Sequence, residues 1–384
     1  MNETTLYYIW LLKSLGQAHS KIKIIFRHFG DVKSIYDAKP KEHIQSGLFT
    51  PKQLERLSDK SLDHAKKVYE YCYKHNQKII TLTSRDYPKR LGQIFDPPIL
   101  LFAEGNISDI ENYPCIAVVG SRKSTEYGNE IAYKLSRDLA RAGAIIVSGC
   151  AVGIDTASHR GALAADGKTV GILGCGIDYP YNMANKNLRD DITVRGAVLS
   201  EHFPDTPPSK YTFPVRNRIM SGISNGVLIV EAGEKSGSLI TARLALEQGK
   251  DVFSVPGSLL SEFSNGTNTL LKDGAIPVTG AMDILLEYAN YYRDSINLSF
   301  DMQPLDAQSP VCEKPKDEKV NENLTFISSE ARELYDIISD SPVHVDELSI
   351  KTSKPVHVLL ARLTELEMAG LITPCPGKLY KRGG

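Results

Sequence analysis

The sequence predicts an α/β protein built from three parts: an extended Rossmann-like parallel sheet in the centre, a small helical domain before it and a winged-helix domain after it. From residue 115 on, apolar strand-like segments alternate with helix-length segments. Residues 1–84 instead carry apolar side chains at helical spacing, and the C-terminal residues hold three helical segments and a hairpin. The parts we expect are a helical domain at 1–84, a Rossmann-like domain at 85–292, a linker at 293–324 and a winged helix at 325–384.

The central strands are continuous apolar runs. We expect them at 115–119, 144–147, 169–173, 196–199, 226–230 and 251–255. Runs of this kind are buried on both faces of a parallel sheet, and segments such as 127–142 and 237–248 are long enough to be the covering helices. Because crossovers between parallel strands are right-handed, the sheet should be doubly wound.

Glycines punctuate the helical domain at Gly16, Gly30 and Gly47. Small helices joined by glycine turns suit a helix-hairpin-helix-like or SAM-like DNA module, but they equally suit a plain packing or protein-contact domain. A proline-rich connector at 85–114, which includes a short strand ending at Gly105, leads into the central sheet.

The C-terminal part follows a charged, proline-containing run at 313–319 that we interpret as linker. Helices are expected around Leu334, at 345–350 and at 355–369, followed by a hairpin, which is the plan of a winged helix. This part has seven basic and eight acidic side chains. Since a sequence-specific duplex reader is normally basic, the balance favours protein contact or weak DNA contact.

Composition narrows the possible functions. The 384 residues include 45 Lys and Arg against 46 Asp and Glu, so a nucleic-acid surface would have to be a local patch. The six cysteines are scattered without a C-x-x-C pair, which predicts reduced thiols in a cytoplasmic protein and no metal site. No apolar run approaches ~18 residues, so no membrane span is expected.

Glycine-containing turns directly follow several of the central strands. Their candidate anion-binding residues are Gly120, Ser121, Arg122, Gly149, Gly153, Ser236 and Gly237. Such turns leave backbone N–H groups directed at the N-terminus of the next helix, where an anion can bind. All of them follow strands, so they should meet at the carboxyl edge of the sheet, where open α/β sheets bind ligands.

A second cluster of donors, Arg216-Asn217-Arg218, lies in the first turns of an expected helix that contains Pro214. Two arginines near a helix N-terminus are electrostatically unfavourable unless an anion lies there. The cluster therefore favours a polyanionic ligand.

Two nucleotide-binding fingerprints fail at identifiable positions. Gly174-Cys175-Gly176 begins like the dinucleotide motif G-x-G-x-x-G, but Tyr179 occupies the third glycine position. The segment 161–169 ends in Gly-Lys-Thr, but it has the wrong glycine spacing for a P-loop and runs from helix to strand. We therefore expect no NAD or ATP, and no cofactor.

Taken together, these motifs resemble the DprA/Smf family of DNA-processing proteins. The resemblance runs from about residue 86 to residue 275. It is carried by Asp96-Pro97-Pro98, Val119-Gly120-Ser121-Arg122, Gly153-Ile154-Asp155, His159-Arg160-Gly161-Ala162, Arg216-Asn217-Arg218, Ser236-Gly237-Ser238-Leu239, Val255-Pro256-Gly257 and Gly266-Thr267-Asn268.

The resemblance implies a protein that binds single-stranded DNA, forms a homodimer through its central domain and loads the RecA recombinase onto incoming strands during natural transformation. It implies no catalytic residue. The side chains that would line the DNA pocket with the glycine turns are Arg122, Lys210, Arg216, Asn217 and Arg218. Met183 stands where the family usually has a basic residue, and we expect Lys186 to compensate. Bases would stack on Tyr179, Tyr181, Tyr211 or Phe213, and the stretch 259–271 would be core or a dimer face.

An enzyme is the alternative. The segment from Gly237 to Thr241 is similar to the glycine-rich loop of nucleoside-monophosphate phosphoribohydrolases of the lysine-decarboxylase-like fold. Those enzymes have a catalytic Glu where this chain has Thr241, so hydrolysis would lack its obvious catalyst.

Overall fold

The computed structural model describes residues 2–180, 186–209 and 211–299, and residues 331–382 with gaps. The chain forms two compact units, Met1–Asp306 and Ala307–Gly384. Residues 300–324 of the expected linker, together with Tyr181, Met183 and Lys210, lie outside the described residues.

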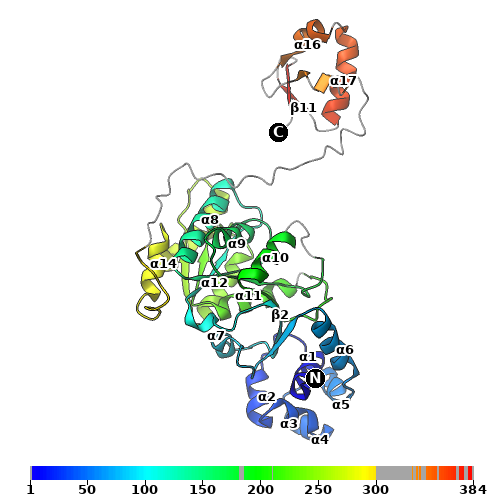
Figure 1. The fold of residues 1–384 in the computed structure, drawn as a ribbon, viewed down its shortest axis with the longest axis vertical. Coiled ribbons are helices and arrows are strands. Elements are labelled where there is room, and N and C mark those ends of the chain that lie inside the picture. The colour runs from blue at the N-terminus through cyan, green and yellow to red at the C-terminus, as the bar shows by residue number, and fades with distance from the viewer. Residues whose placement is uncertain are drawn as a thin grey trace. The chain divides into compact units, whose positions relative to one another are not determined.

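A nine-stranded sheet forms the centre of the first unit, in the order β1-β2-β6-β5-β4-β3-β7-β8-β9 (Figure 1). Its parallel strands are β3 (Cys115–Val119), β4 (Ile145–Ser148), β5 (Thr169–Ile172), β6 (Ala197–Ser200), β7 (Gly226–Ile229), β8 (Asp251–Ser254) and β9 (Ile276–Pro277). β2 (Leu100–Gly105) pairs antiparallel with β6, and β1 (Lys78–Thr81) pairs antiparallel with β2. The six expected central strands are confirmed to within one residue at each end.

Helices cover both faces of this sheet, because every central strand is apolar on both sides. The helices α8 (Glu126–Arg141), α9 (Ile154–Ala164) and α14 (Ala281–Tyr288) share a core with one face. The opposite face packs against α7 (Lys89–Gln93), α11 (Thr212–Ile223) and α12 (Ser238–Glu247). Between these elements in the sequence lie α10 (Lys186–Arg195), η3 (Glu262–Ser264) and α13 (Asn265–Lys272).

The N-terminal helices form a cluster at the β1–β2 end of the sheet (Figure 1). They are α1 (Glu3–Leu15), α2 (Ile22–Phe29), α3 (Val32–Asp37), α4 (Pro40–Gln45), α5 (Pro51–Ser58) and α6 (Asp63–Lys74). α1 is buried on nearly all sides and forms the middle of the cluster, and the same core continues into Leu100 and Phe102 of β2. The expectation of a helical segment up to residue 84 is wrong for Lys78–Thr81, because these residues pair with β2 as an edge strand.

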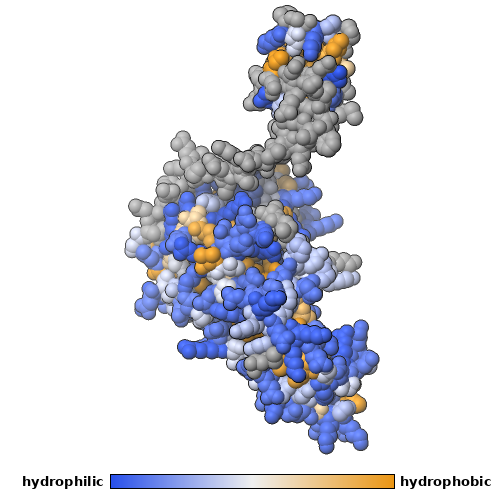
Figure 2. Space-filling view, turned by 45° about the vertical axis from the view of Figure 1, so that its right-hand side comes forward, coloured by the Kyte–Doolittle hydropathy of each residue, from blue (hydrophilic) through white to orange (hydrophobic). Residues whose placement is uncertain are grey.

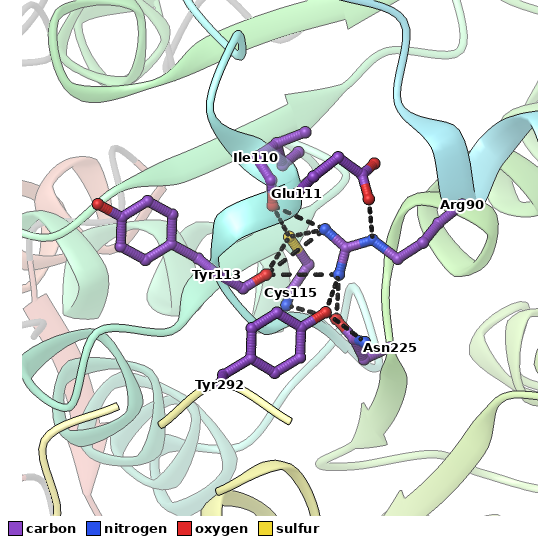
Figure 3. Close-up of polar contacts among 7 residues, drawn as sticks. All are labelled: Arg90, Ile110, Glu111, Tyr113, Cys115, Asn225 and Tyr292. Atoms are coloured by element: carbon purple, nitrogen blue, oxygen red, sulfur yellow. Dashed lines mark hydrogen bonds and ion pairs between the residues drawn. The ribbon is translucent and has the colours of Figure 1, made fainter. Parts of the chain in front are cut away.

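The amino edge of the sheet is fastened by Arg90, whose side chain is almost fully buried (Figure 3). Its guanidinium donates to the carbonyl oxygen of Ile110 at 2.7 Å and to the side-chain oxygen of Asn225, and it lies 3.6 Å from the carboxylate of Glu111. The same Asn225 oxygen accepts from the backbone N–H of Cys115. One cation thus joins α7, η1 (Ile110–Asn112) and the starts of β3 and β7, at the edge opposite the glycine turns.

The second unit contains β10 (Val343–His344), α16 (Val345–Thr352), α17 (Val356–Met368), β11 (Ile372–Cys375) and β12 (Leu379–Arg382). Its strands form a small antiparallel sheet in the order β10-β12-β11, over a core that includes Leu348, Leu359 and Leu363. The expected winged-helix plan is confirmed.

Four cysteines in the described part of the chain are free, buried thiols: Cys72, Cys115, Cys150 and Cys175. No helix among the described residues is both long enough and apolar enough to cross a membrane.

Candidate nucleic-acid interface

The topology of the sheet creates a crevice at one place on its carboxyl edge. From β3 the chain moves outward through β4, β5 and β6, and it then returns to place β7 on the other side of β3. The loops after β3 and β7 therefore leave in opposite directions, which is where α/β sheets bind ligands. A cavity of about 840 Å³ lies there, lined by residues from 119–123, 213–220, 233–241 and 262–265 together with Ala151 and Asp155.

The turn after β3 needs a glycine at position 120. A Cβ on Gly120 would lie 2.6 Å from the side chain of Ile154 and 2.9 Å from the carbonyl oxygen of Glu231. The next residue, Ser121, donates its backbone N–H to that same Glu231 carbonyl at 2.8 Å. The turns after β3 and β7 are thus tied together directly below the cavity.

The side chain of Glu231 is buried and has a structural role. Its carboxylate accepts from the backbone N–H of Thr125 at 2.9 Å and from the Thr125 hydroxyl at 2.6 Å. Thr125 is the N-cap of α8 and accepts in turn from the N–H of Gly128. Because this carboxylate is engaged at the helix N-terminus, it fixes the loop and does not face the cavity.

The turn after β4 brings a cation to the floor of the cavity. A Cβ on Gly149 would lie 1.7 Å from a guanidinium nitrogen of Arg216 and 2.5 Å from a carboxylate oxygen of Asp155. Only glycine permits this approach. Gly153 has a φ of +82° and passes close to the backbone oxygens of Ser121 and Arg122, so the second turn supports the first.

Arg216 and Asp155 lie together at the base of the cavity, both largely buried. Arg216 donates to the carbonyl oxygen of Ile172 at 2.8 Å. Burial raises the pKa of the Asp155 carboxyl, and the charge of Arg216 opposes that rise. Behind them, burial and the same guanidinium lower the pKa of His159 to about 3, so this imidazole is neutral near pH 7 and cannot serve there as a cationic ligand.

The wall of the cavity combines cations with an aromatic ring. The exposed guanidinium of Arg122 lies 4.5 Å from the ring centre of Phe213, in the first turn of α11. Lys123 and Lys235 also line the cavity, and neither forms an ion pair within the described part of the chain. Three carboxylates also line the cavity: Asp155 beside Arg216, and Glu234 and Glu262 from the segments 233–241 and 262–265, whereas the segment 119–123, which carries Arg122 and Lys123, has none.

Arg218 does not line the cavity, contrary to the expectation from the sequence. The structure does not bring its side chain to the cavity: Arg218 is 3% exposed and forms an ion pair at 2.5 Å with Glu201, which is also buried. Its guanidinium also donates to the carbonyl oxygen of Asp96 at 2.7 Å. This arginine is thus paired with carboxylates inside the protein, away from the cavity lining.

The other candidates divide into two groups. Those that line the cavity are Gly120, Ser121, Arg122, Arg216, Asn217, Ser236 and Gly237. Gly149 and Gly153 shape it from beneath, whereas Lys186 is exposed at the start of α10 and is not part of the lining. Sequence reasoning missed Lys123 as well as Phe263 and Asn265, which lie before and in α13. The only available signal for Phe263 and Asn265 was their position after a central strand.

The comparisons with known proteins agree with this architecture. Residues 78–289 match the family described as DNA recombination-mediator protein A. The chain belongs to this family. Residues 316–378 match the DprA winged helix domain, so the expected resemblance to DprA/Smf proteins is confirmed.

Relatives of the chain include proteins of similar length and solved structures. The DNA processing protein DprA of Bacillus subtilis is 44% identical over 208 residues, which cover 54% of this chain and 70% of that relative. Protein Smf of Escherichia coli is 33% identical over 371 residues, or 96% of this chain and 94% of the relative. The X-ray structure of DprA from Streptococcus pneumoniae matches 74% of this chain and 98% of its own, with 37% identity and a TM-score of 0.65.

A second solved structure concerns the single-stranded DNA binding mode of DNA processing protein A from Helicobacter pylori. It matches 56% of this chain and 97% of its own, with 32% identity and a TM-score of 0.51.

Proposed function

We propose that this chain binds single-stranded DNA in the cavity at the β3–β7 switch point. The observation that carries the proposal is the combination of Arg122, Phe213 and Arg216 around a crevice floored by glycine turns. Guanidinium groups and backbone amides bind phosphate, and a ring beside them offers a stacking surface that accepts any base. A crevice of this kind selects a flexible polyanion with accessible bases, which describes a single strand.

In the bound state, phosphates lie on Arg122, Arg216 and the amides of the turns that contain Gly120 and Ser236. A base takes the place of the Arg122 guanidinium on the ring of Phe213, or stacks on the other face of that ring. Base–aromatic stacking contributes about 1–3 kcal/mol per base. Lys186 and Lys210 stay candidate phosphate contacts, as the resemblance to the family implies. The family relationship supports this placement, since the Helicobacter pylori relative binds single-stranded DNA.

Beyond binding, we propose that the protein acts in the cytoplasm on DNA taken up during natural transformation, protects the single strand and loads the RecA recombinase onto it. Loading needs the DNA to be held by its backbone, so that the recombinase can take over the bases. It needs no chemical step from the DNA binder, and we assign no catalytic residue or cofactor. The support for this role is the family relationship together with the proposed strand site.

Replacing Arg122 with alanine tests the site. We expect Arg122→Ala to bind single-stranded DNA more weakly, and the slope of log affinity against log salt to fall by about 0.7, as expected for one lost phosphate contact. Fluorescence anisotropy with a labelled oligothymidylate over a range of salt concentrations measures both. Arg141→Ala is the matched control, because Arg141 is exposed in the last turn of α8 and does not line the cavity. Equal affinity and equal slope for the wild type and Arg122→Ala would refute the site.

The hydrolase alternative has less support in the structure. Thr241 lines the cavity and is buried, so a non-ionisable side chain occupies the position where the similar enzymes have a Glu. Incubation with AMP should release no adenine, and sustained turnover would favour an enzyme after all.

A further inference from the structure

One surface of the helical cluster has the composition of a nucleic-acid contact and lies outside the cavity. We define the α6 face as Lys66, Lys67, Tyr71, Tyr73 and Lys74, which are all exposed. Tyr73 is 81% exposed, and Tyr71 stacks on His75 with 4.0 Å between ring centres. None of the three lysines has a carboxylate at ion-pair distance within the described residues, although Glu70 lies among them on the same helix.

The charge of the whole cluster supports a polyanionic ligand. Residues 1–77 contain thirteen Lys and Arg against eight Asp and Glu, whereas the rest of the chain contains thirty-two against thirty-eight. Figure 2 shows hydrophilic residues over most of the visible surface of this cluster. A local excess of positive charge in a chain of net charge -1 is the electrostatic footprint of nucleic-acid contact.

The end of α6 is hydrogen-bonded to the loop after β5, which leaves the sheet at the edge that carries the cavity. Gln77, just after α6, donates to both carboxylate oxygens of Asp178, at 2.9 and 2.8 Å. Burial and the nearby Asp178 carboxylate raise the pKa of the Tyr71 phenol, so these two groups are neighbours. Asp178 belongs to the loop after β5, which leaves the sheet at the same edge as the turns after β3 and β4.

The two sites lie within reach of one DNA strand. Gln77 also donates to Glu104 of β2, and β2 is four strands from β3, which corresponds to roughly 20 Å at the usual spacing of neighbouring strands. A DNA strand that leaves the cavity across β4, β5 and β6 reaches the α6 face after several nucleotides. We propose that the α6 face is a second subsite for the same single-stranded DNA, in which the lysines bind phosphates and Tyr73 stacks on a base. This subsite rests on the proposed function of the cavity and extends it to the helical cluster.

Oligonucleotide length separates the two sites. Oligothymidylates from about 6 to about 20 nucleotides bracket the site sizes of single-strand-binding folds. The wild type should gain affinity when the strand becomes long enough to reach α6. The variant Lys67→Gln/Lys74→Gln should bind the shortest strands normally, lose that gain, and show a salt slope lower by about 1.4 with the longest strands, for two lost phosphate contacts. Tyr73→Gln should weaken binding of the longest strands at least about fivefold, for one lost stacked base.

The control variant is Lys39→Gln/Lys41→Gln. It removes the same charge from exposed residues of the same cluster at α4, which lies away from the sheet (Figure 1). It should retain the length dependence of the wild type. All substituted side chains are exposed and glutamine is a good helix former, so folding should be preserved.

Photo-crosslinking gives a direct readout of the same contact. A long strand that carries 5-iodouracil should crosslink to the tryptic peptide 68–74, which contains Tyr71 and Tyr73. The subsite is refuted if Lys67→Gln/Lys74→Gln keeps the full length dependence, or if no crosslink maps to this peptide. Failure of the wild type to bind even short strands, or normal short-strand binding by Arg122→Ala, would instead overturn the cavity itself.

Discussion

On α11, Arg216 and Arg218 point in opposite directions, because two residues along an α-helix are about 200° apart. Arg216 lies under the cavity, whereas Arg218 meets Glu201 and Asp96 on the far side. Helical periodicity alone could have separated these two arginines. It could not have shown which of them faces the ligand, because Glu201 comes to Arg218 from another part of the chain.

Removing the buried cation should therefore act on stability. We expect Arg218→Ala to lower the free energy of unfolding by about 3–5 kcal/mol, because it leaves the Glu201 carboxylate buried without its partner. Urea denaturation measures this. The double variant Arg218→Met/Glu201→Gln should lose less stability than Arg218→Ala, since it buries no uncompensated charge.

The DNA affinity of folded Arg218→Ala distinguishes the two roles. It should match the wild type with short single strands. A stable Arg218→Ala protein that has lost its short-strand affinity would return Arg218 to the binding site and contradict its assignment to the protein core.

At the scale of elements, the central strands were predictable because each is a short, continuous apolar run between glycine turns. β1 was not, because Lys78–Thr81 becomes a strand only by pairing with β2. The part of the cavity lining from Phe263 to Asn265 follows β8 and has no phosphate-binding sequence pattern of its own. The sequence predicts core or a dimer face at 259–271, whereas Phe263 and Asn265 of this stretch line the cavity.

The contacts of His159 between α9 and β5 predict that the free energy of unfolding depends on pH. His159 of α9 is fully buried, with 2.7 Å between its Nδ1 and the Thr169 hydroxyl oxygen of β5 and 3.6 Å between its Nε2 and the Cys150 sulfur. Burial and the nearby Arg216 lower the pKa of the ring from 6.5 to about 3. Below pH 6.5 the unfolded chain therefore binds a proton on this histidine, whereas the folded protein keeps the ring neutral. The contribution of the neutral ring to the free energy of unfolding is complete above pH 6.5 and decreases as the pH falls toward 3.

The expected slope is up to about 1.4 kcal/mol per pH unit for this histidine. Urea unfolding between about pH 6.5 and pH 5, a window above the ordinary pKa of carboxyl groups, should show it. His159→Gln should have a shallower pH dependence than the wild type. The residual slope comes from the histidines that remain in the variant: burial lowers the pKa of His202 to about 4 and also lowers the pKa of His19, His43 and His64. Identical slopes would show that His159 does not titrate on unfolding.

At the scale of the whole molecule, the three-part plan followed from periodicity, but the packing of the helical cluster against β2 and β6 did not. That packing depends on a core that joins α1 to Phe102 and Val198, far apart in sequence. The proposed second subsite depends on this packing, because it brings the end of α6 to the loop after β5. In the winged helix, Arg362 of α17 lies 3.0 Å from Glu365.

Self-association is expected through the central domain. Leu259 and Leu260 are 86% and 98% exposed after β8, next to the wall of the cavity. Adjacent apolar side chains that are this exposed mark a contact surface. We expect a homodimer that Leu259→Ser/Leu260→Ser weakens, as measured by sedimentation equilibrium. A wild type that is monomeric at micromolar concentration would contradict the proposed dimer.

The β3–β7 crevice is proposed to bind single-stranded DNA through its phosphates and bases. The most direct test is a competition experiment in which a labelled oligothymidylate bound to the full chain is challenged with unlabelled single strands or with duplex of the same length at one salt concentration. We predict that single strands displace the probe at much lower concentration than duplex does, and that Arg122→Ala narrows this difference. Equal displacement by duplex, or a difference that Arg122→Ala leaves unchanged, would contradict the claim.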